Sequence, residues 1–164
     1  MTKSIKKGLK VEILPDEDMI NKINQNIGNA RFVWNNILST YNNLFKLFSQ
    51  NNCHLKTNFK NSNAMLMMLK KEHDFLVEGE STSQQQVFID LNNAFNRFRK
   101  GISGYPKFKS KKNPKNSFRI KKNGNNIRIT NRRIKLAKLG HVHYRTSKKY
   151  KKLLKSSKIN KCNS

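Results

Sequence analysis

Acidic side chains are the residues with which a metal-dependent nuclease holds its cations, because such sites gather several carboxylates on one scaffold. The chain has nine acidic residues, and all of them fall within residues 12–90. The acidic run at 16–18 lies where a helix is expected to begin, so it suits capping and the helix dipole. Glu78 and Glu80 belong to a polar connector. The sequence therefore contains no recognisable set of catalytic carboxylates.

Histidine and cysteine offer little more chemistry. His141 and His143 are two positions apart in an expected strand, so both face the same way. A shared metal ion would lack a third ligand nearby, which favours a pair of surface histidines. Cys53 and Cys162 lie too far apart in the sequence for a zinc-type pair and form no disulfide framework. We therefore expect no catalytic residue, no metal and no cofactor, and we expect that the chain as it stands is not an enzyme.

The basic side chains are distributed very unevenly. Of 35 Lys and Arg residues, 11 lie in residues 1–90 beside all nine acids, and 24 lie in residues 91–164, where there is no Asp or Glu. The net charge of +26 therefore comes almost entirely from the second half. Such a surface points to a polyanion, either nucleic acid or, as the main alternative, an anionic membrane surface. No signal peptide or membrane-spanning stretch is recognised, so we expect a cytoplasmic protein that binds no membrane.

The elements that must present these charges begin with helices. Leu9, Val11 and Ile13 alternate with charged residues, which predicts a short strand. Apolar residues then recur at three- and four-residue steps and predict an amphipathic helix over 16–49. A shorter helix is expected over 62–72, and 74–81 is expected to be a connector. The apolar side of the shorter helix would consist of Ala64, Met65, Met68 and Leu69. A third helix is expected from Ser83, with Gln86 as its capping-box partner, to Gly101 or Gly104.

The hydrophobic period changes after Gly104. Apolar residues now come in pairs two positions apart, which predicts four short strands of a small antiparallel sheet or barrel. Asn123-Gly124 is a tight-turn signal. The segment after Thr146 is compatible with either a helix or a tail. The pairs are Phe118/Ile120, Ile127/Ile129, Ile134/Leu136 and Val142/Tyr144.

The segment Gly104–Lys112 alternates aromatic and cationic residues directly after an expected helix end. Aromatic faces can stack on unpaired bases while lysines neutralise phosphates. An equally good interpretation is that Tyr105 and Phe108 anchor the segment to the core. Both interpretations hold at once if one ring is buried and the other is exposed.

Four stretches resemble the N-terminal half of the OrfB/TnpB family, the transposon-encoded RNA-guided DNA endonucleases. Lys10–Pro15 (KVEILP) is similar to the family's first strand, and Gly28–Asn35 (GNARFVWN) to its G-x-x-R-F-V-x-N helix. Asp90–Ser110 (DLNNAFNRFRKGISGYPKFKS) resembles the block that ends G-x-P-x-F-K-S. Ile134–Val142 (IKLAKLGHV) resembles R-L-x-L-P-K-L-G-x-V, with Ala137 in place of the usual Pro.

The resemblance implies an α+β fold in which a partial, wedge-like antiparallel β-barrel is interrupted by an α-helical recognition insert. The first strand would occupy 1–14, the insert 15–104, the remaining barrel strands 105–145 and a basic tail 146–164. It also implies that Gln85 lies near the short DNA motif that flanks the target, and that the basic half holds guide RNA and duplex backbone. The expected contact residues are Arg31, Gln85, Arg97, Arg99, Lys100, Tyr105, Lys107, Lys109, Lys111, Lys112, Arg119, Lys121 and Lys122.

Members of this family continue through a RuvC-like nuclease domain with three acidic residues and usually a four-cysteine zinc element. The present sequence is interpreted as truncated before that domain. The expected partners are guide RNA from the transposon end and double-stranded DNA next to the target. Two alternatives stay open: one half of a split or frameshifted nuclease that a separately encoded RuvC portion completes, and a general basic RNA-binding protein.

Overall fold

The computed structural model describes residues 10–50, 62–112, 117–130, 132–147 and 161–163. Leu9, the segment with Cys53 and His54, and most of the expected tail lie outside these ranges. The described elements are β1 (Glu12–Leu14), α1 (Glu17–Gln50), α2 (Ser62–Glu72), α3 (Phe75–Glu78), α4 (Ser81–Arg99), β2 (Arg119–Lys121), β3 (Arg128–Ile129), β4 (Arg133–Leu136), β5 (Gly140–Arg145) and β6 (Lys161–Asn163).

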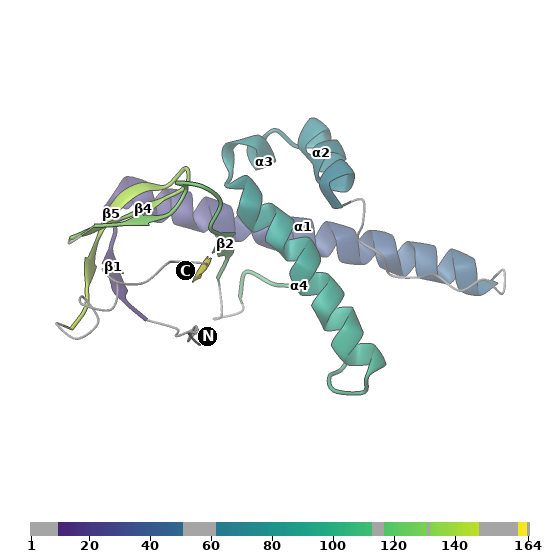
Figure 1. Ribbon diagram of the computed structural model, residues 1–164. Helices are drawn as coiled ribbons and strands as arrows, with labels where there is room; N and C mark the ends of the chain where they lie inside the picture. The colour runs from purple at the N-terminus through teal and green to yellow at the C-terminus, as the bar shows by residue number, and fades with distance from the viewer. Residues whose placement is uncertain (1–9, 51–61, 113–116, 131, 148–160, 164) are drawn as a thin grey trace.

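Helix α1 is the axis of the molecule, and its bounds differ from the expected 16–49 by one residue at each end. Asp16 caps it, because its carboxylate accepts a hydrogen bond from the backbone N–H of Met19 at 2.8 Å. The middle of the expected apolar stripe is buried. Ile20 and Leu44, near the stripe's ends, are instead 44% and 37% exposed. Figure 1 shows the reason for Leu44: the C-terminal part of α1 extends past the other helices.

Helix α2 has the expected bounds, and its buried face is the expected one only in part: Leu69 is buried and Met65 packs against the core as expected. Leu66 and Leu69 are buried, whereas Met68 is 63% exposed. The connector at 74–81 contains one helical turn, α3, which the sequence did not indicate. Its four residues carry too little periodicity to be recognised, and Leu76 within it is fully buried.

Helix α4 begins two residues before the expected Ser83. Its cap is Glu80, whose carboxylate accepts hydrogen bonds from the Ser83 backbone N–H at 2.6 Å and from the Thr82 hydroxyl at 2.7 Å. The expected Ser83–Gln86 capping box is therefore wrong, and the Gln86 amide donates to Asp90 instead. Glutamate is not among the preferred N-cap residues, which is why the sequence pattern pointed to the serine.

Helix α4 ends at the first of the two expected glycines. Gly101 has a φ of +69°, its N–H donates to the carbonyl of Phe98, and the next N–H, of Ile102, donates to that of Arg97. This is the Schellman arrangement, in which a left-handed residue satisfies the last helical carbonyls. A side chain at Gly101 would be strained in that conformation.

The main sheet has four antiparallel strands in the order β1-β5-β4-β3. Ile13 of β1 lies opposite Tyr144 of β5, so all four helices lie in sequence between two hydrogen-bonded strands of one sheet. Strand β2 was expected in this sheet but pairs with β6 instead. Asn123-Gly124 forms the expected turn, with Gly124 at a φ of +54°, but it joins strands of different sheets.

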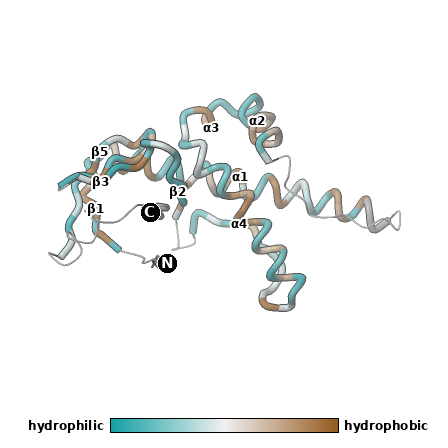
Figure 2. The backbone as a smooth tube through the Cα atoms, in the orientation of Figure 1, coloured by the Kyte–Doolittle hydropathy of each residue, from teal (hydrophilic) through white to brown (hydrophobic). Residues whose placement is uncertain are grey.

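The α+β class is confirmed, and the sheet formed by the described strands is not closed. The partial barrel, the recognition role of the helices and the four domain boundaries stay predictions. A single hydrophobic core joins helices and strands: α1 contributes Val33, Ile37 and Leu38, α4 contributes Phe88 and Leu91. Figure 2 shows hydrophobic and hydrophilic residues interspersed along the helices, as expected where each helix buries one face.

Candidate nucleic-acid interface

The segment Gly104–Ser110 runs along α1 and is held there by two side chains of that helix. The Trp34 indole N–H donates to the carbonyl of Lys107 at 3.0 Å. The Asn35 amide donates to the carbonyl of Lys109 at 2.9 Å and accepts from the Lys109 N–H at 2.8 Å. Asn35 therefore pairs with the segment's backbone as a neighbouring strand would. We call residues 104–112 the docked loop.

The two aromatic residues of the docked loop have different roles. Tyr105 packs edge-to-face against Phe95 and Phe98, with ring centroids 5.6 and 5.2 Å away. Its hydroxyl donates to the Asn42 side chain at 2.7 Å, and burial raises the pKa of the phenol. Tyr105 is still 43% exposed, and Phe108, for which no packing partner ring is found among the described residues, is 57% exposed. One ring therefore anchors the loop, and the other remains available to stack on a base.

Lys109 is held against the protein. Its ammonium nitrogen lies 4.1 Å from the centroid of the Trp34 ring, a cation–π contact. Desolvation lowers the pKa of this ammonium, Asp90 raises it and Arg119 lowers it. Arg119 donates to Asp90 at 2.8 Å in an ion pair whose side chains are about one-third exposed. Of these two expected contacts, Arg119 is therefore already paired with Asp90, and the ammonium of Lys109 is engaged by Trp34.

The other expected cations follow the docked loop from one end to the other. Figure 1 shows the chain turning at the end of α4 and running back toward β2. Arg97, Arg99 and Lys100 lie at the far end and are exposed. Lys107, Lys111, Lys112 and Lys121 are also exposed, and Lys122 is half-buried. The cations form an extended track rather than one cluster.

The glutamine run at the start of α4 exposes one member. Gln84 is fully buried and donates to the carbonyl of Leu76, and Gln86 is buried on Asp90. Gln85 is exposed, and its amide donates to Asn63 of α2 at 3.2 Å. Because the Glu80 carboxylate occupies the end of the helix, α4 offers an amide side chain there rather than an open phosphate site.

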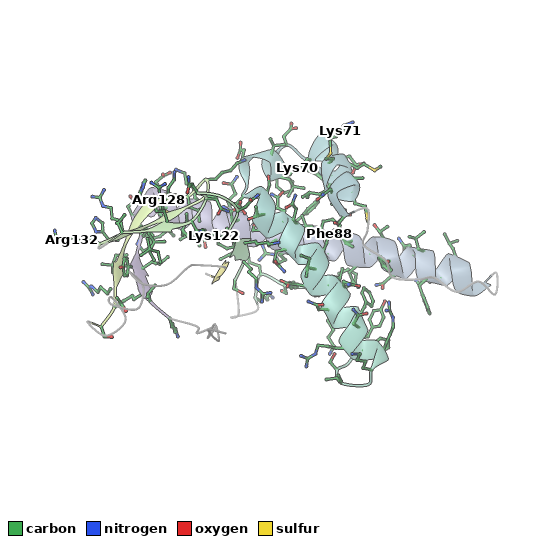
Figure 3. All side chains as sticks on the ribbon, in the orientation of Figure 1. Lys70, Lys71, Phe88, Lys122, Arg128 and Arg132 are labelled. Carbon is green, nitrogen blue, oxygen red and sulfur yellow. The ribbon has the colours of Figure 1, made fainter. Side chains whose placement is uncertain are left out.

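Two lysines beside this helix start were not expected at the site. The Lys70 ammonium donates to the Ser81 hydroxyl at 2.8 Å, and that of Lys138 donates to the carbonyl of Val77 at 2.7 Å. Burial lowers the pKa of Lys70, Lys138 lowers it further, and Glu80 raises it. They come from α2 and the β4–β5 turn, so only the tertiary fold brings them together. Figure 3 labels Lys70 on α2 and Lys122 near β2.

Arg31, also an expected contact, lines a groove of about 520 Å³. Phe32 and Phe75, which meet edge-to-face at 5.1 Å, form part of its apolar lining.

Among the described residues, no three side chains of His, Cys, Asp or Glu gather as metal ligands. His141 and His143 are exposed on β5, as a surface pair. No helix in the described part of the chain is long and apolar enough to cross a membrane.

Residues 1–48 match the family model of the OrfB helix-turn-helix domain of IS605 elements. This match supports membership of the OrfB/IS605 family for the N-terminal part of the chain. Comparison with curated proteins gave no match. Within residues 10–48 the chain contains β1 and an uninterrupted α1, so the described part of the matched segment is a strand and one helix rather than two helices and a turn.

The four stretches that resemble the OrfB family meet in pairs in this structure. Strand β1, in the first stretch, pairs with β5, which begins in the fourth. Trp34 and Asn35, which end the second stretch, hold the docked loop, which belongs to the third. Gly140 of the fourth stretch has a φ of +95° and is the first residue of β5, directly after the turn from β4. The motifs therefore specify contacts that hold the fold and position the loop.

Proposed function

We propose that this chain is the nucleic-acid-binding part of an OrfB/TnpB-like transposon protein. In this proposal it binds guide RNA from the transposon end and duplex DNA next to the target, and does not itself cut DNA. The observation that carries the proposal is the docked loop, which presents the exposed ring of Phe108 between Lys107 and Lys109 on a rigid helix. The match of residues 1–48 to the OrfB helix-turn-helix model and the acid-free second half support it.

Single-stranded RNA suits this loop because each base offers a face for stacking and each nucleotide a phosphate for a nearby cation. Backbone contacts through lysine and arginine also make binding strongly salt-dependent. Tyr105 fixes the start of the loop and Asn35 its middle, so the loop gives up little conformational entropy when RNA binds.

Duplex DNA suits the start of α4, where the exposed Gln85 amide is supported by Asn63. A glutamine side chain can donate to and accept from adenine in the major groove, which gives it the chemistry to read a base pair. The ammonium groups of Lys70 and Lys138 nearby would contribute positive charge toward the phosphates.

The decisive measurement is the affinity of the full chain for a labelled RNA from the transposon end, compared with Phe108→Ala. Loss of one stacked base is expected to weaken binding by about 1–3 kcal/mol. Phe45→Ala is the matched control, because Phe45 is an equally exposed phenylalanine, at 61%, on the part of α1 that extends beyond the other helices. With duplex DNA as the probe, Gln85→Ala should reduce the preference for the cognate motif.

Wild-type affinity should also fall steeply between roughly 50 and 200 mM salt. Equal losses for the two phenylalanine variants would show that the docked loop is not the binding surface. An affinity insensitive to salt would contradict the electrostatic basis of the proposal. Cleavage of either probe by the purified chain would show that the non-catalytic assignment is wrong.

A further inference from the structure

The strand register gathers basic side chains on one face of the main sheet, and none of them is among the individually expected contact residues. Directly opposed residues of antiparallel strands share a face. Arg128 of β3 is opposite Lys135 of β4, which is opposite His141 of β5. In the next row, Arg133 of β4 is opposite His143 of β5. All of these residues are exposed, and we call this surface the outer sheet face.

The outer sheet face has few groups that could neutralise its charge. Leu14 completes the second row, and Glu12, opposite Arg145, is the one carboxylate on the face. Two ion pairs in the described part of the chain, Lys22–Asp18 within α1 and Arg119–Asp90 between β2 and α4, both lie away from this face. The opposite face of the same strands is apolar and buried, with Ile134 and Val142 in the core. The charged face is therefore directed to solvent.

Placing like charges directly opposite one another destabilises a sheet by several tenths of a kcal/mol per pair. The Arg128–Lys135 pair is such a contact, and Lys135 meets a titratable base on its other side as well. A polyanion that spanned the rows would remove this repulsion. Figure 3 shows the Arg128 and Arg132 side chains extending from the sheet, at the end of the molecule away from Lys71.

The two histidines make the charge of this face adjustable. The Arg133 side-chain Nε–H donates to Nε2 of His143 at 3.1 Å, which requires that ring nitrogen to be unprotonated. The groups that face His143 are Arg133 and Leu14, and the group that faces His141 is Lys135. Arg145 and Glu12 lie in the adjacent row. Protonation would add charge beside existing cations, which is unfavourable unless an anion is present.

We propose that the outer sheet face is a second binding surface for the phosphate backbone of nucleic acid, separate from the docked loop and strengthened when His141 and His143 are protonated. This inference rests on the proposed function, since it assigns a further contact of the same nucleic acid. Protonated rings would add positive charge to the rows that face the phosphates, so the proposal predicts that binding tightens at lower pH.

The first test removes the first row and measures the salt dependence of RNA binding. Arg128→Gln/Lys135→Gln should lower the slope of log affinity against log salt by about 1.4, at about 0.7 per phosphate contact to a single strand. The same variant should be as stable as wild type or more stable, because it removes a like-charge pair. Lys71→Gln is the control: Lys71 is exposed on α2, off both surfaces, and its loss should leave the slope unchanged.

The second test compares RNA affinity at about pH 8 and about pH 6 for wild type and for His141→Gln/His143→Gln. Wild-type affinity should rise by roughly three- to tenfold at the lower pH, and the histidine variant should lose most of that rise. Equal pH dependence in both proteins would overturn the histidine role. An unchanged salt slope in the first test would overturn the surface itself.

These outcomes are distinguishable from failure of the proposed function. If Phe108→Ala weakens RNA binding while the sheet variants behave as wild type, the docked loop is supported as a binding surface and the outer sheet face is ruled out. If wild type does not bind RNA at all, the proposed function fails first. Vesicles containing an anionic lipid serve as a competing probe: sheet variants that lose vesicle binding but keep full RNA affinity would assign the face to a membrane surface and overturn the proposal.

Discussion

The side chain of Asn35 joins α1 to the docked loop. Its amide makes two hydrogen bonds to the backbone of Lys109, which lies 74 positions away. Asn35→Ala removes both, and each contributes about 0.5–1.5 kcal/mol. We expect the free energy of unfolding to fall by about 1–3 kcal/mol in urea titrations. Trp34, the single tryptophan of the chain, bonds to the same loop, so its fluorescence should report the loosened loop in the folded state.

The matched control for this prediction is Asn36→Ala. Asn36 is the adjacent position and carries an identical side chain, but it borders the groove rather than the docked loop. Its substitution should change stability by less than about 0.5 kcal/mol. If both variants unfold alike and leave the Trp34 emission unchanged, the loop is held by something other than Asn35.

At this scale the sequence predicted residue types better than residue roles. The alternation of aromatics and cations identified the loop, but the expected division into one buried and one exposed ring is not found: Tyr105 packs on other rings and is still 43% exposed, and Phe108 is 57% exposed. The sequence could not show that Tyr105 is the ring that anchors the loop, because this depends on its packing against Phe95 and Phe98 of α4. The ion pair that engages Arg119 was equally hidden, since Asp90 lies 29 positions away.

Two glycines illustrate how packing between elements decides the effect of one methyl group. A Cβ at Gly79, between α3 and α4, would lie 2.2 Å from the Asn29 side-chain nitrogen and 2.8 Å from that of Gln84. Both amides are hydrogen-bonded to backbone carbonyls of α3 and cannot move without losing those bonds. We expect Gly79→Ala to lower the melting temperature and the free energy of unfolding, by about 1–3 kcal/mol.

Gly28 provides the opposite case within α1. A Cβ there would meet only the end of the Arg31 side chain at 4.0 Å, which is ordinary contact. Because glycine in a helix costs about 1 kcal/mol relative to alanine, Gly28→Ala should stabilise the protein by roughly that amount. Chemical unfolding of both variants checks the pair. A loss of stability in Gly28→Ala would mean that this position of α1 packs more tightly than its distances indicate.

Elements whose signals are local were predicted well. The bounds of α1 and α2 follow from a strong apolar period and a capping aspartate, which act within a few residues. The start of α4 was missed because its cap is a glutamate, and α3 because one turn has no period. Strand β2 was recognised as a strand but placed in the wrong sheet. Its partner β6 lies about 40 residues away, in a segment that gave no clear signal.

The arrangement of charge belongs to the whole molecule, and the sequence could predict only its amount. The acid-free second half indicated a polyanion partner, yet it distributes its cations over two surfaces. One is the track along the docked loop, which the sequence suggested. The other is the outer sheet face, which depends on Arg128, Lys135 and His141 coming into register across three strands. A shift of one residue in any pairing would reverse the faces, and no local pattern fixes that register.

The same global arrangement predicts how the molecule opens. The middle of α1, from Ala30 to Tyr41, packs into the core shared by helices and strands, whereas Leu44, Phe45 and Leu47 are 37–61% exposed. Fully burying one such side chain contributes about 1.5–3 kcal/mol, so the two parts of one helix differ greatly in local stability.

Native-state hydrogen exchange should show the middle of α1 opening only with global unfolding. The amides after Leu44 should exchange at least on the order of 100-fold faster. Uniform protection along all 34 residues of α1 would contradict this and would mean that the helix end is covered in solution. Adding RNA distinguishes the surfaces further: it should slow exchange in the docked loop and on β4 and β5, and leave the end of α1 unchanged.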